Sequence, residues 1–175
     1  MSVCYATTSD AAEIAVRFHG LRAESVRLLP LGVDTGLFRP IEARQDREER
    51  GRQRAALHVG EDEILCIYTG RFTVAKNPLC LARAVEILRS RGLAFRALFL
   101  GEGEQTAAIA AVAGCEAKPF IPYPELGGFF RAADIGVWPC QESISMLDAA
   151  AGGLPIIVGD KLKARERVDG NGLTY

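Results

Sequence analysis

The chain has 175 residues, of which 49% are hydrophobic and 25% are charged. This is the composition of a globular protein, and the length suffices for one full-sized hydrophobic core rather than for two comfortable domains. The 21 basic and 22 acidic side chains leave a net charge of −1, which gives no general attraction to nucleic acid or to an anionic membrane surface. We therefore expect one domain, with no nucleic-acid partner, that binds any anionic ligand at a local site.

Cysteine and histidine usage argues against a metal centre. The five cysteines show no CxxC spacing and are accompanied by only two histidines, so neither a zinc site nor a disulfide framework is predicted. The sequence also lacks a Ser-His-Asp order, an HExxH motif and a P-loop. No apolar run approaches the ~20 residues needed to span a bilayer. We expect a soluble cytoplasmic protein without a transmembrane segment.

The N-terminal third of the chain has irregular patterning. Residues 3–8 predict a strand, residues 11–18 a helix, and residues 27–34 a short apolar strand. Residues 42–54 are dense in mixed charge with almost no apolar stripe, so a solvated helix or loop is expected there. Because the first elements precede the regular part, and residues 172–175 follow directly on a turn, we expect both ends to be cut from a longer protein.

From residue 64 onwards, strand-length apolar runs alternate with segments of helical spacing. The predicted strands are residues 64–69, 95–100, 134–138 and 155–158, and the predicted helices are residues 79–91, 105–112, 125–132 and 145–151. The strands are nearly all apolar, as a sheet covered on both faces requires. This order predicts an α/β protein with a Rossmann-like, doubly wound parallel sheet.

In such a sheet, ligands bind outside the carboxyl ends of the strands. The loop after the first strand of the regular part carries Arg71 and Lys76 just before a helix. The forked guanidinium of Arg71 and the ammonium of Lys76, both at the start of one helix, could together bind a diphosphate. The same spacing is also expected if both side chains are simply solvated cations of a surface loop. The GxG pair Gly101 and Gly103 follows the next strand, and a tight strand-to-helix turn explains it without a ligand.

The stretch ESISMLD, residues 142–148, places two acids at the start of a helix rich in alanine. Ser145 and Asp148 fit a capping box, in which the hydroxyl accepts from a backbone N–H and the acid reaches back. A carboxylate at a strand's carboxyl end can also accept the two adjacent hydroxyls of a ribose. Spacing alone leaves both interpretations open.

Five motifs, taken in order, resemble one family over nearly the whole chain. They are LPLGVDTGLFRP (29–40), YTGRFTVAKNP (68–78), LFLGEGE (98–104), FIPYPELGGFFRAADIGVWP (120–139) and ESISMLDAAAGGLPIIV (142–158). The chain is identified as similar to the C-terminal donor-binding domain of retaining, GT-B-fold glycosyltransferases, group 1 and family 4-like. Each motif alone is weak evidence for the family. The resemblance is specific because all five motifs occur in the right order and at plausible spacing.

The resemblance implies a role for each candidate residue. Arg71 and Lys76 would hold the diphosphate of a UDP-, GDP- or ADP-sugar without a metal or other cofactor, and Asp148 would hold the ribose. Glu142 would face the donor sugar and is counted, with Arg71 and Lys76, among the catalytic residues. The remaining expected nucleotide-binding residues, with the base against Phe120 and Ile121, are Gly70, Phe120, Ile121, Ser143, Ser145 and Met146.

The sequence departs from the family pattern at this motif. Five residues separate Glu142 from Asp148, whereas the family usually has seven residues between two glutamates. We also expect the domain that would bind the acceptor, which could be a glycan, a lipid-linked sugar or a small molecule, to lie outside this sequence. Residues 1–26 resemble the end of that domain or the linker after it, so residues 1–175 would be one donor-binding domain with this short extension.

Two other functions stay open from the sequence. A nucleotide-sugar epimerase uses a related two-domain cleft, but it would need further acids and a histidine that are not found in this half. The other alternative is a non-catalytic nucleotide-binding or protein-interaction module. The resemblance implies instead a hexosyltransferase-like enzyme of glycan or polysaccharide biosynthesis. We expect this fragment of it to be inactive when isolated. Peripheral membrane contact could arise through the absent domain.

Overall fold

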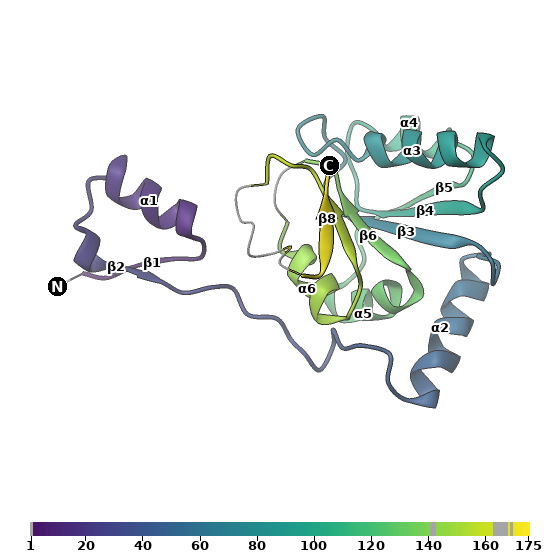
Figure 1. Ribbon diagram of the computed structural model, residues 1–175, viewed down its shortest axis with the longest axis horizontal. Helices are drawn as coiled ribbons and strands as arrows, with labels where there is room; N and C mark the ends of the chain where they lie inside the picture. Colours follow the sequence, from purple (N-terminus) through teal and green to yellow (C-terminus); the bar gives the residue numbers. More distant parts are fainter. Residues whose placement is uncertain (1, 141–142, 163–167, 169) are drawn as a thin grey trace.

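A computed structural model describes residues 2–140, 143–162, 168 and 170–175. Within these ranges the chain forms a six-stranded parallel sheet flanked by helices, and a separate two-stranded parallel sheet at the N-terminus (Figure 1). No helix of this described part is both long enough and apolar enough to cross a membrane.

The larger sheet has the strand order β5-β4-β3-β6-β7-β8. Its strands are β3 (Ile64–Thr69), β4 (Phe95–Leu100), β5 (Cys115–Lys118), β6 (Ile135–Trp138), β7 (Ile156–Val158) and β8 (Gly172–Thr174). The chain first winds outward from β3 to β5 and then returns to place β6 on the other side of β3. The point where the winding reverses, between β3 and β6, is where open α/β sheets form a crevice.

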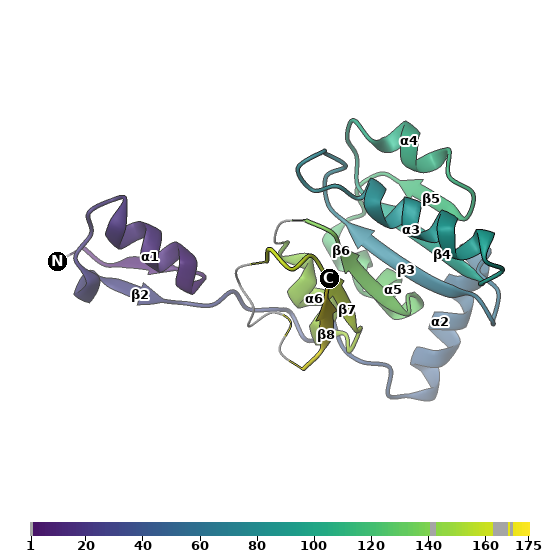
Figure 2. The same ribbon diagram turned by 45° about the horizontal axis from the view of Figure 1, so that its top comes forward.

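Helices cover both faces of this sheet. α3 (Leu79–Ser90) and α4 (Thr106–Ala110) lie on one face, and α5 (Tyr123–Ala132) and α6 (Ser145–Ala151) lie with α2 (Arg44–Ala56) on the other (Figures 1 and 2). The predicted doubly wound α/β fold is therefore confirmed. The strands predicted at residues 64–69 and 95–100 coincide with β3 and β4.

The core lies between the central strands and both helix layers. In β3, every residue from Leu65 to Thr69 is buried, as expected for a strand covered on two sides. Tyr68, Phe72 and Phe99 form an aromatic cluster with ring centroids 6.1–6.2 Å apart. Because Phe72 lies in the loop after β3, this cluster fixes part of the carboxyl edge of the sheet to the core.

The N-terminal elements form a small βαβ unit. β1 (Cys4–Ala6) pairs in parallel with β2 (Val26–Leu28), with α1 (Ser9–Arg17) and a short 3₁₀ turn (Ala23–Ser25) between them. Thr8 caps α1 by accepting from the N–H of Ala11 at 3.2 Å. An extended segment leads from this unit to the larger sheet (Figure 1). Its first side chain buried in the core is Phe38, which is 1% exposed.

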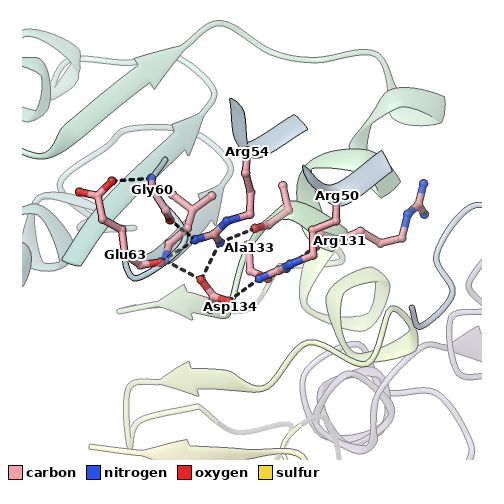
Figure 3. Close-up of polar contacts among 9 residues, drawn as sticks. Arg50, Arg54, Gly60, Glu63, Arg131, Ala133 and Asp134 are labelled. Carbon is pink, nitrogen blue, oxygen red and sulfur yellow. Dashed lines mark hydrogen bonds and ion pairs between the residues drawn. The ribbon is translucent and has the colours of Figure 1, made fainter. Parts of the chain in front are cut away.

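The charged segment at residues 42–54 forms most of helix α2, but the expectation that it is solvated is wrong for one of its faces. Arg54 is only 8% exposed and donates to the carbonyls of Gly60, Glu63 and Ala132. Arg54 and Arg50 also pair with Asp134, at 2.9 and 2.6 Å, in the cluster shown in Figure 3. The buried residues of α2 are the polar Asp46 and Arg54. The lack of an apolar stripe therefore did not indicate that the whole helix is exposed to solvent.

Asp134 is the acceptor at the centre of this cluster. Burial alone would raise its pKa, but hydrogen bonds from the N–H of Leu65 and from Arg54 and Arg50 together lower it. Asp134 directly precedes β6 and Leu65 lies at the start of β3. The cluster therefore fastens α2 to the amino edge of the sheet, opposite the edge where ligands are expected.

Two adjacent glycines in α5 are expected to respond to alanine in opposite directions. A Cβ on Gly127 would lie 2.4 Å from the carbonyl oxygen of Leu37, whereas a Cβ on Gly128 would meet nothing within 4 Å. We expect Gly127→Ala to lower the free energy of unfolding by about 1–3 kcal/mol. Gly128→Ala should raise it by about 0.5–1 kcal/mol, because alanine loses less entropy in a helix. Urea denaturation of both variants checks this, and equal effects would contradict the packing at Leu37.

Candidate functional site

The candidate site lies at the carboxyl ends of β3 and β6, where the sheet reverses its winding. Thr69, the last residue of β3, accepts at its backbone carbonyl a hydrogen bond from the indole N–H of Trp138, the last residue of β6, at 3.1 Å. Its hydroxyl donates to Ser145 Oγ at 2.6 Å. These two contacts bring the loop after β3 next to the start of α6.

The loop after β3 contains Gly70, Arg71 and Lys76. Arg71 is exposed, and its carbonyl accepts from the hydroxyl of Tyr68 at 3.0 Å. Burial is the main cause that raises the pKa of Tyr68, so its phenol remains protonated and can donate. Lys76 is half-buried, and its N–H donates to the carbonyl of Thr73 at 3.1 Å. The backbone that carries both cations is thus held by the core strand and by a local turn.

The two glycines after β4 serve this same loop. A Cβ on Gly101 would lie 1.9 Å from the carbonyl oxygen of Gly70, and one on Gly103 would lie 2.5 Å from that of Phe72. Phe72 in turn donates its N–H to the carbonyl of Glu102 at 2.9 Å. Close approach of two backbones thus accounts for the GxG pair without a ligand.

The capping box, one of the two interpretations left open for Ser145 and Asp148, is absent. α6 begins at Ser145, with Ile144 at the N-cap position and no side-chain capping bond. The hydroxyl of Ser145 instead contacts those of Thr69 and Ser143, the latter at 2.7 Å. That interpretation is wrong because the neighbouring strand β3 supplies a partner for Ser145 that the local sequence does not reveal.

Asp148 is a buried acid, with 2% of its surface exposed. Its Oδ1 accepts from the hydroxyl of Tyr123 at 3.1 Å. Burial raises the pKa of Asp148, and the Tyr123 hydrogen bond opposes that rise. The ring of Tyr123 lies edge-on to Phe38, with centroids 5.1 Å apart. A buried carboxylate in the first turn of the helix that follows β6 has the chemistry to accept hydroxyl donors.

The other predicted residues occupy different environments. Phe120 is 57% exposed, whereas Ile121 is partly buried against the core. Met146 is fully buried, so its side chain belongs to the core. Ser143 donates its N–H to Met146 Sδ at 3.4 Å. Glu142 lies outside the described residues.

Three site residues escaped the sequence analysis: Thr69, Trp138 and Tyr123. Thr69 and Tyr123 contact the predicted residues Ser145 and Asp148 from other elements, and Trp138 contacts Thr69. No spacing in the sequence connects such pairs. The signal that could have found Thr69 and Trp138 is their place as the last residues of neighbouring strands. Among the described residues, no three His, Cys, Asp or Glu side chains come together as metal ligands would.

Comparison with known proteins gives the family. Residues 63–175 match the family described as "Glycosyl transferases group 1". The chain is 30% identical over 165 residues to the D-inositol 3-phosphate glycosyltransferase of Pseudarthrobacter chlorophenolicus, a match that covers 86% of this chain and 37% of that protein. The chain therefore spans well under half the length of this relative.

Solved structures agree in fold. A glycosyltransferase from Rickettsia africae ESF-5 superposes with a TM-score of 0.81 at 14% identity, over 99% of this chain and 48% of that one. WaaG, a glycosyltransferase involved in lipopolysaccharide biosynthesis, gives a TM-score of 0.80 at 16% identity, over 97% of this chain and 48% of that one. With the family match over residues 63–175, these observations lead to one conclusion: the chain belongs to the group 1 glycosyltransferases.

Proposed function

We propose that this chain is the donor-binding half of its glycosyltransferase and binds a UDP-, GDP- or ADP-sugar. The observation that carries the proposal is the 2.6 Å contact between Thr69 and Ser145. It joins the loop of Arg71 and Lys76 to the helix of the buried Asp148, and so brings cations and a hydroxyl acceptor to one edge of the sheet. A nucleoside diphosphate needs both kinds of group.

Each residue then has a distinct role. Arg71 and Lys76 neutralise the charge that develops on the leaving diphosphate, which makes a metal ion unnecessary. Asp148 accepts from the ribose hydroxyls, while the half-exposed Phe120 and the neighbouring Ile121 support the base. The role proposed for Glu142, which lies outside the described residues, is toward the donor sugar. We propose transfer with retention of configuration, which the family resemblance supports.

The acceptor is bound elsewhere in the whole protein. We propose that a preceding domain, of which residues 1–26 are the end, holds a glycan, a lipid-linked sugar or a small molecule. This chain alone should then bind nucleotide and transfer no sugar. The comparisons do not favour the alternatives of a nucleotide-sugar epimerase or a non-catalytic nucleotide-binding module.

Isothermal titration calorimetry with UDP, GDP and ADP tests the donor site. The wild-type chain should bind at least one of them, and Arg71→Ala combined with Lys76→Ala should weaken that binding at least tenfold, since each charge-assisted hydrogen bond contributes about 1.5–3 kcal/mol.

The matched control removes the same charge from elsewhere. Arg52 and Arg91 are exposed and lie on α2 and just after α3, at or near the opposite edge of the sheet. Arg52→Ala combined with Arg91→Ala should leave nucleotide affinity within about twofold of wild type, because exposed charges at that distance are largely screened. Equal losses in the two double variants, or no binding by wild type, would overturn the proposal.

A further inference from the structure

The hydroxyl of Tyr123 is the side-chain donor that contacts Asp148 among the described residues, at 3.1 Å from Oδ1. The two residues come from different helices: Tyr123 is the first residue of α5, and Asp148 lies in the first turn of α6. These helices share one face of the sheet (Figures 1 and 2). The hydrogen bond therefore connects two elements at the level of the proposed ribose site.

Asp148 needs such a donor if it is to work as a charged acceptor. With 2% of its surface exposed, the carboxylate has lost nearly all contact with water, and burial disfavours its ionised form. A hydrogen bond from a phenol favours the ionised form and fixes the torsion of the carboxylate at the same time. Since Oδ1 is held by Tyr123, the orientation of Oδ2 is fixed as well.

The ring of Tyr123 is itself held by an aromatic neighbour. Its ring lies edge-on to Phe38, which is 1% exposed and packs on Phe130 with centroids 5.8 Å apart. Burial and the charges of Asp148 and Asp34 raise the pKa of Tyr123, so the phenol keeps its proton at physiological pH. The hydroxyl is thus a donor with a fixed position, although 46% of the residue is exposed.

We propose that Tyr123 is a positioning residue for donor recognition, whose hydroxyl orients the carboxylate of Asp148 toward the ribose hydroxyls. This inference rests on the ribose role of Asp148 proposed above. In this proposal Tyr123 joins the residues that recognise the donor without contacting the nucleotide itself. Tyr123 acts through Asp148, and its removal should alter recognition of the ribose without altering recognition of the diphosphate.

The test compares ribonucleotides with their 2′-deoxy counterparts. Dissociation constants of UDP, GDP and ADP and of the three 2′-deoxynucleoside diphosphates are measured by calorimetry for wild type, Tyr123→Phe and Asp148→Asn. For a base that binds, wild type should prefer the ribonucleotide by about tenfold. Asp148→Asn should reduce this preference to about twofold, and Tyr123→Phe to about threefold, while affinity for the deoxynucleotide changes by less than about twofold.

Tyr5→Phe is the matched control, because Tyr5 lies in β1 of the N-terminal unit and is 64% exposed. It should keep the wild-type preference. An unchanged preference in Tyr123→Phe, or an equal loss of affinity for both sugars, overturns the positioning role. A wild type that binds nucleotides through Arg71 and Lys76 without preferring ribose overturns it too, but leaves the diphosphate site standing. A wild type that binds none of the six nucleotides overturns the proposed function and this inference together.

Discussion

Arg54→Ala is expected to lower the free energy of unfolding by about 3 kcal/mol. The guanidinium of Arg54 donates to three backbone carbonyls and to Asp134, and the substitution leaves these acceptors with fewer partners in a largely buried place. Asp134 keeps Arg50 and the N–H of Leu65, so its carboxylate is not stranded. Urea denaturation, followed by the fluorescence of the single, buried Trp138, measures the change in the sheet domain.

Two further variants separate charge from geometry in this cluster. Arg52→Ala removes an exposed arginine from the same helix and should change stability by no more than about 0.5 kcal/mol. Arg54→Lys keeps the charge but loses the planar fork, and should recover less than half of the loss. If Arg54→Ala costs no more than Arg52→Ala, the cluster in Figure 3 does not hold α2 to the sheet.

Gly101→Ala is expected to cost more than about 3 kcal/mol of stability, from backbone strain and overpacking together. The added Cβ would lie 1.9 Å from the carbonyl oxygen of Gly70, and the backbone angle φ is +147°. Because that carbonyl belongs to the loop of Arg71, the loop must move if the variant folds. Nucleotide affinity should therefore fall along with stability, which calorimetry and urea denaturation measure separately.

Gly92→Ala is the control for strain without a clash. Gly92 has φ of +80°, and a Cβ there would meet nothing within 4 Å. Its substitution should cost about 1 kcal/mol and leave nucleotide affinity unchanged. A Gly101→Ala variant that behaves like Gly92→Ala would show that the backbones of the two site loops do not approach as closely as described.

Much of the fold could be predicted from the sequence because its longest strands are apolar on both faces. Residues 64–69 and 95–100 stand out for this reason and coincide with β3 and β4. β5 and β8 were not predicted. β5 is half-buried and contains Glu116 and Lys118, and β8 has two exposed residues of three, so neither shows the apolar run of a central strand.

The candidate site was predictable only where a loop follows a recognisable strand. Arg71 and Lys76 could be placed in this way, and their role in binding stays a prediction. The interactions that hold the site together could not be foreseen, because Thr69 and Ser145, or Tyr123 and Asp148, are distant in sequence. The same reason explains the failed capping box and the overlooked buried face of α2. Local patterns do not encode partners that another element supplies.

The connection between the N-terminal unit and the larger sheet is shorter than it looks in Figure 1. Leu29 is still tied to β1, since its N–H donates to the carbonyl of Ala6 at 2.8 Å. Val33 already packs against the core, and Asp34 accepts from the N–H groups of Leu37 and Phe38. Only the exposed residues 30–32 are left between these two anchors.

Three residues reach about 10 Å when fully extended, and the first of them, Pro30, has a fixed φ. Any rotation of the βαβ unit relative to the larger sheet must therefore occur about residues 30–32. This pivot ends two residues before Asp34, where the chain turns toward Phe38. Only residues 33–37 therefore separate this pivot in sequence from Phe38, which packs against Tyr123 beside the proposed ribose site.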